Sequence, residues 1–119
     1  MDLIGKLQEC SSMKLVLLEE MYALTLAQTQ AFHEDCLEEL GRLVNEKQSR
    51  IDAINKLDAD FDSAFKQLKN ELKVNSLDQL AELKLPGVGQ LKLTIEAILG
   101  KIPEIQRLEM QNDEKANEL

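Results

Sequence analysis

The sequence is poor in the residues that interrupt helices and in those that most often build catalytic sites. It has two prolines, two cysteines, one histidine and no tryptophan, and aromatic residues make up only 3% of its 119 residues. So few prolines leave long stretches of the chain free to remain helical. So few aromatic side chains mean that a core must consist mainly of Leu and Ile, which is typical of packed helices.

The sequence also has no excess of basic over acidic residues and no long run of apolar residues. The formal net charge is −8, and an acidic surface disfavours nucleic acids and anionic membranes, because phosphate groups need a basic footprint. No apolar run approaches the ~18 residues of a membrane-spanning helix, and the first residues lack the pattern of a secretory signal. Cys10 and Cys36 stand too far apart for a CxxC motif. We therefore expect free thiols in a reducing compartment, a cytoplasmic location, and neither nucleic acid nor membrane as a partner.

What the sequence does contain is a long apolar repeat in its middle. Eleven positions between Leu37 and Leu72 alternate in steps of three and four, and only Lys47 and Asp58 among them are polar. This 3.5-residue repeat predicts a single helix of roughly 55 Å whose apolar seam lies against other helices. The nine apolar positions are Leu37, Leu40, Val44, Ile51, Ile54, Phe61, Phe65, Leu68 and Leu72. Such a rod favours a binding scaffold over a catalytic pocket.

Breaks in the apolar pattern divide residues 1–119, which we take as one domain, into helices. The first helix has a wide apolar face, which predicts contact with more than one neighbour. The predicted fold is all-α: an elongated antiparallel three-helix bundle or coiled coil with a short extra helix. One continuous helix over residues 2–72 is the alternative, disfavoured because a short chain needs a partner for its seam. The expected helices span residues 2–32, 36–73, 76–84 and 89–117.

Capping and turn signals mark the expected helix ends. Asp35 and Ser76 are each followed three residues later by a Glu or Gln, which is the spacing of a capping box at the start of a helix. Leu-Pro-Gly-Val-Gly at residues 85–89 predicts a turn, because Pro fixes one φ and Gly supplies a positive one. Pro103 lies inside the last helical pattern and removes an amide donor. We expect a kink near it, with a complete break as the alternative.

The titratable residues form no recognisable catalytic or metal-binding pattern. His33 is followed by Glu34 and Asp35, whose negative charge would repel an incoming phosphoryl group, so a phosphotransfer histidine is disfavoured. Adjacent side chains on a helix also point in different directions and do not close on one metal ion. The sequence has no Gly-rich phosphate loop and no Gly-x-Ser-x-Gly motif. We expect no enzyme, no cofactor and no metal.

The last helix carries more apolar surface than a single partner helix would cover, and polar residues interrupt its seam. Polar seam residues either fix the register of a bundle or mark a groove in which a partner helix docks. The excess of apolar surface favours a partner under the second explanation. The candidate protein-binding residues are Ile95, Ile98, Leu99, Ile102, Ile105, Leu108, Glu109 and Asn112.

Three stretches of the chain share the pattern of a known chaperone family. They are Leu17-Leu18-Glu19-Glu20 with Leu24, LGRLVNEKQSRIDAINKLD at residues 40–58, and EIQRLEMQNDEKANEL at residues 104–119. With these stretches the chain resembles flagellar export chaperones of the FlgN type, and of the related FliT type. FlgN-like chains tend to end in a Leu-Asn-x-x-Asn run; here Leu108 and Asn112 match it, but Glu109 replaces the first Asn.

The resemblance implies a cytoplasmic, non-enzymatic chaperone of type III flagellar export with three antiparallel helices. FlgN-like proteins bind hook–filament junction proteins, which are hook-associated, before secretion; FliT-like proteins bind the filament cap protein. The export apparatus is a further partner that the resemblance suggests. Family members use their C-terminal helix region for the substrate, which corresponds here to residues 95–112. The alternative is a structural coiled-coil or self-assembling protein without a client, in which the extra apolar face forms a homodimer.

Overall fold

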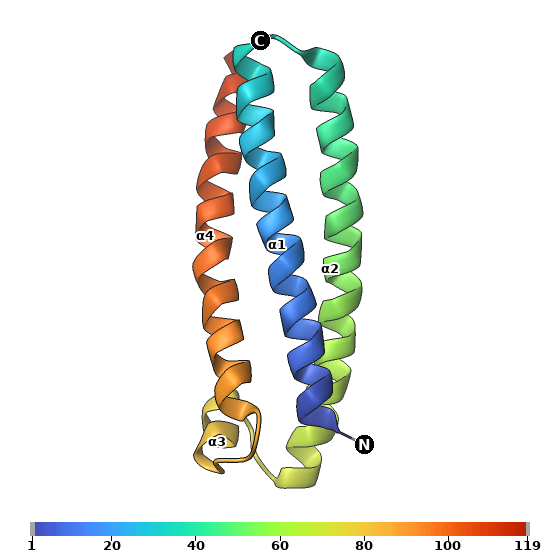
Figure 1. The fold of residues 1–119 in the computed structure, drawn as a ribbon, viewed down its shortest axis with the longest axis vertical. Coiled ribbons are helices and arrows are strands. Elements are labelled where there is room, and N and C mark those ends of the chain that lie inside the picture. Colours follow the sequence, from blue (N-terminus) through green and yellow to red (C-terminus); the bar gives the residue numbers. More distant parts are fainter. Residues whose placement is uncertain (1, 119) are drawn as a thin grey trace.

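The computed structural model describes residues 2–118, which form an elongated helical bundle of 54 × 20 × 19 Å (Figure 1). The chain runs up through α1, back through α2, across the short α3 and up again through α4 (Figure 1). The predicted all-α class is confirmed, and every helix end lies within two residues of its expected position. Met1 and Leu119, the ends of the predicted domain, lie outside the described residues. The helices are α1 (Leu3–His33), α2 (Leu37–Leu72), α3 (Leu77–Glu82) and α4 (Val88–Glu118).

The central helix of the bundle is α1. It packs along both α2 and α4, whereas no Cα atom of α2 lies within 8 Å of a Cα atom of α4. A buried face wide enough for two neighbours explains this arrangement, as the apolar pattern of this segment predicted. The buried residues of α1 are Leu3, Leu7, Cys10, Ser11, Leu18, Met21, Thr25, Gln28 and Ala31.

A short turn at residues 34–36 reverses the chain between α1 and α2, so the expected hairpin is confirmed. The expected cap is wrong. Asp35 has a left-handed φ of 53°, and Cys36 occupies the N-cap position of α2 without a side-chain cap hydrogen bond. The backbone satisfies the turn instead, because the Cys36 amide donates to the Ala31 carbonyl oxygen over 3.0 Å. Asp tolerates the left-handed conformation better than most residues, which explains its place here.

The other end of the bundle is closed by α3 and the turn that follows it. The Ser76 hydroxyl accepts from the Gln79 amide over 3.1 Å, and the Gln79 side chain accepts from the Asn75 amide over 2.6 Å. The expected cap is therefore confirmed, with the Gln side chain reaching one residue further back than in a standard capping box. Gly87 has a φ of 88°, which only glycine adopts without strain, so the predicted turn is confirmed and α4 begins directly after it.

Two apolar clusters fill the bundle. The base cluster lies at the α3 end and draws on all four helices and on Val74 between α2 and α3. The middle cluster lies further along, between α1 and α4. The buried members of the base cluster are Leu3, Leu7, Ala64, Leu68, Val74, Leu80, Val88 and Leu91; those of the middle cluster are Leu18, Met21, Ile98 and Ile105.

The apolar repeat of α2 does not stay buried along its whole length. Leu37, Val44 and Ile51 are 68%, 54% and 37% exposed, whereas Leu68 is 5% exposed. A straight α-helix has 3.6 residues per turn, so a heptad stripe drifts by about 20° per heptad, or roughly 100° over five heptads. One row of the stripe, Leu37, Val44 and Ile51, thus lies on the outside, whereas Leu40 and Ile54 are half-buried and Lys47 is buried. The expectation of one continuous buried seam is wrong for the first half of α2.

The last helix, α4, continues through Pro103 without interruption. Pro103 is exposed, so its ring and its missing amide lie on the solvent side of the helix, where water replaces the lost hydrogen bond. Figure 1 shows α4 bowed rather than broken. The alternative of a complete break is therefore wrong.

Candidate functional site

A groove lies between α2 and α4, because both helices run close to α1 while their own backbones stay more than 8 Å apart, measured between Cα atoms. We call it the α2–α4 groove; its volume is about 200 Å³. Its only charged lining residues, Lys14 and Asp58, form an ion pair with an N···O distance of 2.8 Å. The rest of the lining is mostly apolar. It comprises Cys10, Ser11 and Lys14 from α1, Leu57, Asp58 and Phe61 from α2, and Ile95, Ile98, Leu99 and Ile102 from α4.

The structure divides the eight predicted binding residues between two places on α4. The first four, Ile95, Ile98, Leu99 and Ile102, line the α2–α4 groove. The other four, Ile105, Leu108, Glu109 and Asn112, lie further along the helix and do not line it. Among the eight, Leu99 alone is largely exposed, at 62%, whereas Ile98, Ile105 and Asn112 are buried.

The exposed apolar residues of α2 extend one wall of this groove towards the α1–α2 turn. Leu37, Val44 and Ile51 follow one another at intervals of seven residues, and the next position in the series is Asp58, which lines the groove. Residues seven apart lie on nearly the same face of a helix. The wall formed by α2 is therefore apolar well beyond the groove itself.

The opposite wall is extended in the same direction by α4. Met110, which is 66% exposed, follows Leu99 by eleven residues, or close to three helical turns, and so lies on the same face. Because α2 and α4 run in opposite directions, both extended walls lead towards the α1–α2 turn (Figure 1). An elongated, partly exposed apolar face therefore follows the groove along the bundle.

Polar contacts join the three long helices beyond the middle cluster. Lys47 of α2 is only 7% exposed, and its ammonium group donates to Gln28 Oε1 of α1 over 2.7 Å. The same ammonium group forms an ion pair with Glu109 of α4. One buried cation thus ties α2 to both other long helices.

The same layer includes Asn112, which is 4% exposed. Its amide nitrogen donates to the Thr25 carbonyl oxygen over 3.1 Å, and its amide oxygen accepts from the Thr29 hydroxyl over 2.7 Å. We call Thr25, Gln28, Thr29, Lys47, Glu109 and Asn112 the polar layer. Buried polar groups with partners in fixed positions define register, which accounts for three of the polar seam residues, Lys47, Glu109 and Asn112.

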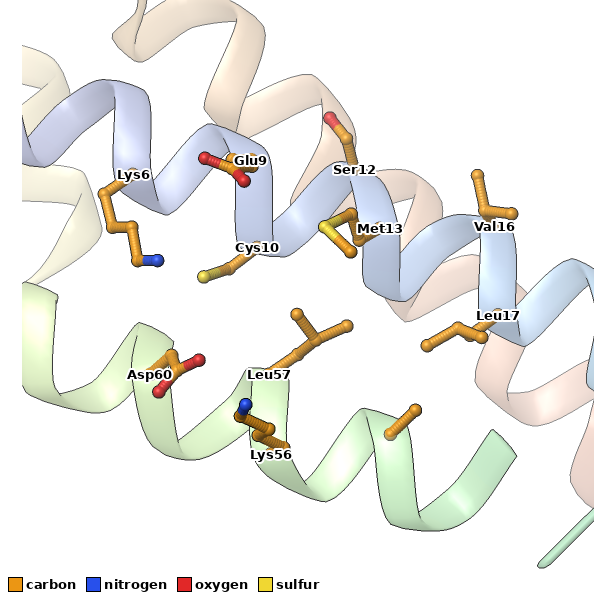
Figure 2. A pocket seen from close by; sticks show the side chains of 11 residues that line it. Lys6, Glu9, Cys10, Ser12, Met13, Val16, Leu17, Lys56, Leu57 and Asp60 are labelled. Carbon is orange, nitrogen blue, oxygen red and sulfur yellow. The ribbon is translucent and has the colours of Figure 1, made fainter. Parts of the chain in front are cut away.

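A second and larger hollow was not anticipated from the sequence. It lies between α1 and α2, has a volume of about 610 Å³, and takes no lining residue from α4. Figure 2 shows Cys10 and Leu17 of α1 and Leu57 of α2 pointing into the space between the two helices. Met13 and Val16 at its edge are 50% and 54% exposed. The available signal was that these two residues fall outside the buried stripe of the first helix.

The described residues were also searched for metal-binding clusters and for membrane-spanning helices. Residues 2–118 contain no group of three or more His, Cys, Asp or Glu side chains placed to hold a metal ion. None of the helices in this range is both long and apolar enough to cross a membrane. His33 is the exposed last residue of α1, and Cys36 is exposed in the adjoining turn.

The family model described as FlgN protein matches residues 1–118, nearly the whole chain. No curated protein and no solved structure matches the chain. The family assignment therefore depends on the sequence pattern of the whole helical domain.

Proposed function

This chain belongs to the FlgN family of flagellar export chaperones, and from that premise we propose that it binds a hook–filament junction protein in the cytoplasm before type III secretion. The bound segment is thereby kept from assembling prematurely. The family supplies the class of function. The structure supports a docking surface on α4, since four predicted binding residues come together in the α2–α4 groove.

The client segment, in this proposal, is an amphipathic helix lying along the groove. The two walls and the floor come from three different helices, so an added helix would take the position of a fourth member of the bundle. Its apolar stripe would cover Leu99 and the neighbouring Ile102, and further along it would meet Ile51 and Met110. Burying these side chains provides the driving force, at about 25 cal/mol per Å² of apolar surface removed from water.

The polar residues of the predicted set act differently in this proposal. Glu109 and Asn112 contact α1 and α2 rather than the groove. We assign them the task of holding α4 at a fixed height and rotation, so that Leu99 and Ile102 stay on the groove wall. They influence the client only through the position of α4.

Leu99→Asp is the sharpest test of the docking surface. Leu99 is 62% exposed in the free protein, so a charge there costs little in folding, but it would be buried without a partner beneath a docked helix. Ile102→Asp is less informative, because Ile102 also packs against the middle cluster. We expect Leu99→Asp to weaken binding of a purified junction-protein terminal segment at least tenfold, equivalent to about 1.4 kcal/mol.

The chain offers a matched control. Leu93 is on the same helix, is 61% exposed and does not line the groove. Isothermal titration calorimetry should show wild-type affinity for Leu93→Asp. Equal affinity of both variants would remove the groove from the binding site, and equal loss in both would point to a nonspecific charge effect. Capture of the filament cap protein instead of a junction protein would overturn the assigned client.

A further inference from the structure

A basic hollow lies at the α3 end of the bundle, on the outside of the last two turns of α2. It has a volume of about 700 Å³ and shares no residue with the proposed client surface. Among the described residues, its lining includes three lysines, one apolar side chain and no acidic residue. We call it the lysine hollow. Its lining residues are Lys66, Lys69, Asn70, Lys73, Val74 and Asn75.

The three lysines form a row on one face of α2. They follow one another at intervals of three and four residues, which places them on the same side of a helix. At about 100° per residue, Lys66 lies roughly 160° round the helix from the buried Leu68, so it points away from the core. Lys66 and Lys73 are exposed. Lys69 is half-buried, and its ammonium group lies 5.0 Å from the centre of the Phe65 ring.

No carboxylate in the described chain balances this row. None of the three lysines forms an ion pair within residues 2–118. Glu71 is the only acidic residue among positions 66–75, and it lines a different hollow, beside Asp2. Asp62 lies one turn before Lys66 but does not line the hollow. The positive charge of the row therefore faces solvent.

The end of α2 does not explain all three lysines. A basic residue in the last turn of a helix compensates the partial negative charge of the free carbonyl groups, and Lys69 and Lys73 are close enough to do so. The effect falls off within one turn, so Lys66 lies too far back. Lys73 also has a left-handed φ of 59°, where Gly or Asn is the usual residue. A purely structural role leaves part of this charge unexplained.

The lysine hollow lies in a basic part of an otherwise acidic chain. Residues 66–93 contain five basic and three acidic residues, a net charge of +2, whereas the rest of the chain contains nine basic and nineteen acidic residues, a net charge of −10. This basic part comprises the end of α2, α3 and the start of α4, which lie at the same end of the bundle (Figure 1). An acidic partner is therefore attracted to this end and repelled by the rest of the surface.

We propose that the lysine hollow is a second docking surface, which binds an acidic helical segment of a protein other than the client. Carboxylates at intervals of three and four residues on such a helix match the lysine row, because both rows rise at the same rate. The side-chain amides of Asn70 and Asn75 donate further hydrogen bonds to this segment. A nucleic acid is disfavoured, since the acidic remainder of the chain repels a phosphate backbone that continues beyond the hollow.

The client and the acidic segment occupy different faces of the bundle. The α2–α4 groove takes Leu57, Asp58 and Phe61 from α2. Lys66 lies about 140° round the helix from Phe61. The proposed client path also leads from the groove towards the α1–α2 turn, at the opposite end of the bundle from α3 (Figure 1). Binding of the acidic segment therefore leaves the client in place.

Fluorescence anisotropy of the full chain with a labelled acidic helix tests the proposal. The probe is an alanine-based helical peptide with Glu at intervals of three and four residues, and the same peptide with Gln at these positions is its control. We expect the wild type to bind the Glu peptide, and to bind it less tightly as the salt concentration rises. Absence of binding, or equal binding of the Glu and Gln peptides, would overturn the proposal.

Two triple variants separate the hollow from net charge. Lys66→Gln/Lys69→Gln/Lys73→Gln should bind the Glu peptide about tenfold more weakly than the wild type. Its matched control is Lys56→Gln/Lys92→Gln/Lys115→Gln, which removes the same charge from exposed positions outside the hollow and should keep wild-type affinity. Circular dichroism checks that both variants are folded. Equal affinity of the two variants would refute the hollow as the site, and tighter binding of a single-stranded oligonucleotide would assign it to nucleic acid instead.

Client binding provides an independent measurement. The variant without the three lysines of the hollow should bind the junction-protein segment like the wild type, and Leu99→Asp should bind the Glu peptide like the wild type. A saturating client should leave the affinity for the Glu peptide unchanged. Loss of client binding in the lysine variant, or competition between client and Glu peptide, would contradict two separate surfaces.

Discussion

The two ends of the bundle are held together by different kinds of contact. At the α3 end, Leu7, Leu80 and Leu91 are 0% exposed and come from three different helices. At the other end, Leu43 of α2 is 1% exposed, but the neighbouring inward residue is Lys47, whose contacts to α1 and α4 are polar. Leu37 and Val44 at that end remain exposed. One end is a compact apolar core, and the other combines a few buried apolar side chains, such as Leu43 and Ala31, with a set of directed hydrogen bonds.

This difference assigns different tasks to the two ends. Apolar burial is nondirectional and large, at about 1.5–3 kcal/mol for each large side chain, whereas a hydrogen bond adds only about 1 kcal/mol net. The α3 end should therefore carry most of the stability. The polar layer mainly defines where α4 lies, and leaves that end of α4 easier to displace. The proposed client surface extends towards this weaker end.

The largest expected effect is at the α3 end. Leu91→Ala removes a fully buried side chain from the base cluster and should lower the free energy of unfolding by about 2–5 kcal/mol. Leu93→Ala, an exposed position two residues away, should change it by less than about 0.5 kcal/mol. Urea denaturation followed by circular dichroism measures both. Similar values for the two variants would contradict the assignment of stability to the base cluster.

An intermediate effect is expected in the polar layer. Lys47→Ala leaves the Gln28 side-chain oxygen, in a residue that is 8% exposed, without its donor. The cost should be about 1–3 kcal/mol, smaller than that of Leu91→Ala. Arg42→Ala breaks a solvent-exposed ion pair with Glu39 and should change stability little. A cost for Lys47→Ala above that of Leu91→Ala would reverse the ranking of the two ends.

The smallest effect concerns pH. Burial raises the pKa of the Cys10 thiol above its usual range, against a lowering influence of Lys6. The folded protein therefore holds this proton more tightly than the unfolded chain, so this contribution to stability is present below the ordinary thiol pKa and is lost as the pH rises above it. A Cys10→Ser variant should show a weaker fall in stability between neutral and alkaline pH. Equal pH profiles would show that the thiol does not ionise differently on folding.

Local signals in the sequence were sufficient for the helices and for most of their ends. The Ser76 cap and the Gly87 turn depend on residues within five positions of one another, and both were predicted. Asp35 also has the cap spacing, but the turn needed a residue with a positive φ, and the backbone requirement prevailed. Whether Asp35 caps the helix or adopts the positive φ of the turn depends on the path of the whole hairpin.

Relations between helices were harder to predict. Leu37, Val44 and Ile51 are exposed because α2 does not supercoil enough to keep a 3.5-residue period against α1. The degree of supercoiling cannot be read from the sequence. Four of the predicted binding residues share a groove with Leu57 and Phe61. Finding that groove required knowing that α2 and α4 both pack on α1 while their backbones stay apart. The polar positions of the seams were identified, but their partners were not.

The central place of α1 also bears on the order in which the chain folds. Contacts between α1 and α2 begin close to their turn, as in Gln28 with Lys47, which are 19 residues apart. Contacts between α1 and α4 are never local: Gln8 with Thr94 and Thr29 with Asn112 are 86 and 83 residues apart. Closing short loops first costs less entropy. The α1–α2 hairpin should therefore form early and serve as a template for α4, with φ-values higher near Leu43 than near Ile105.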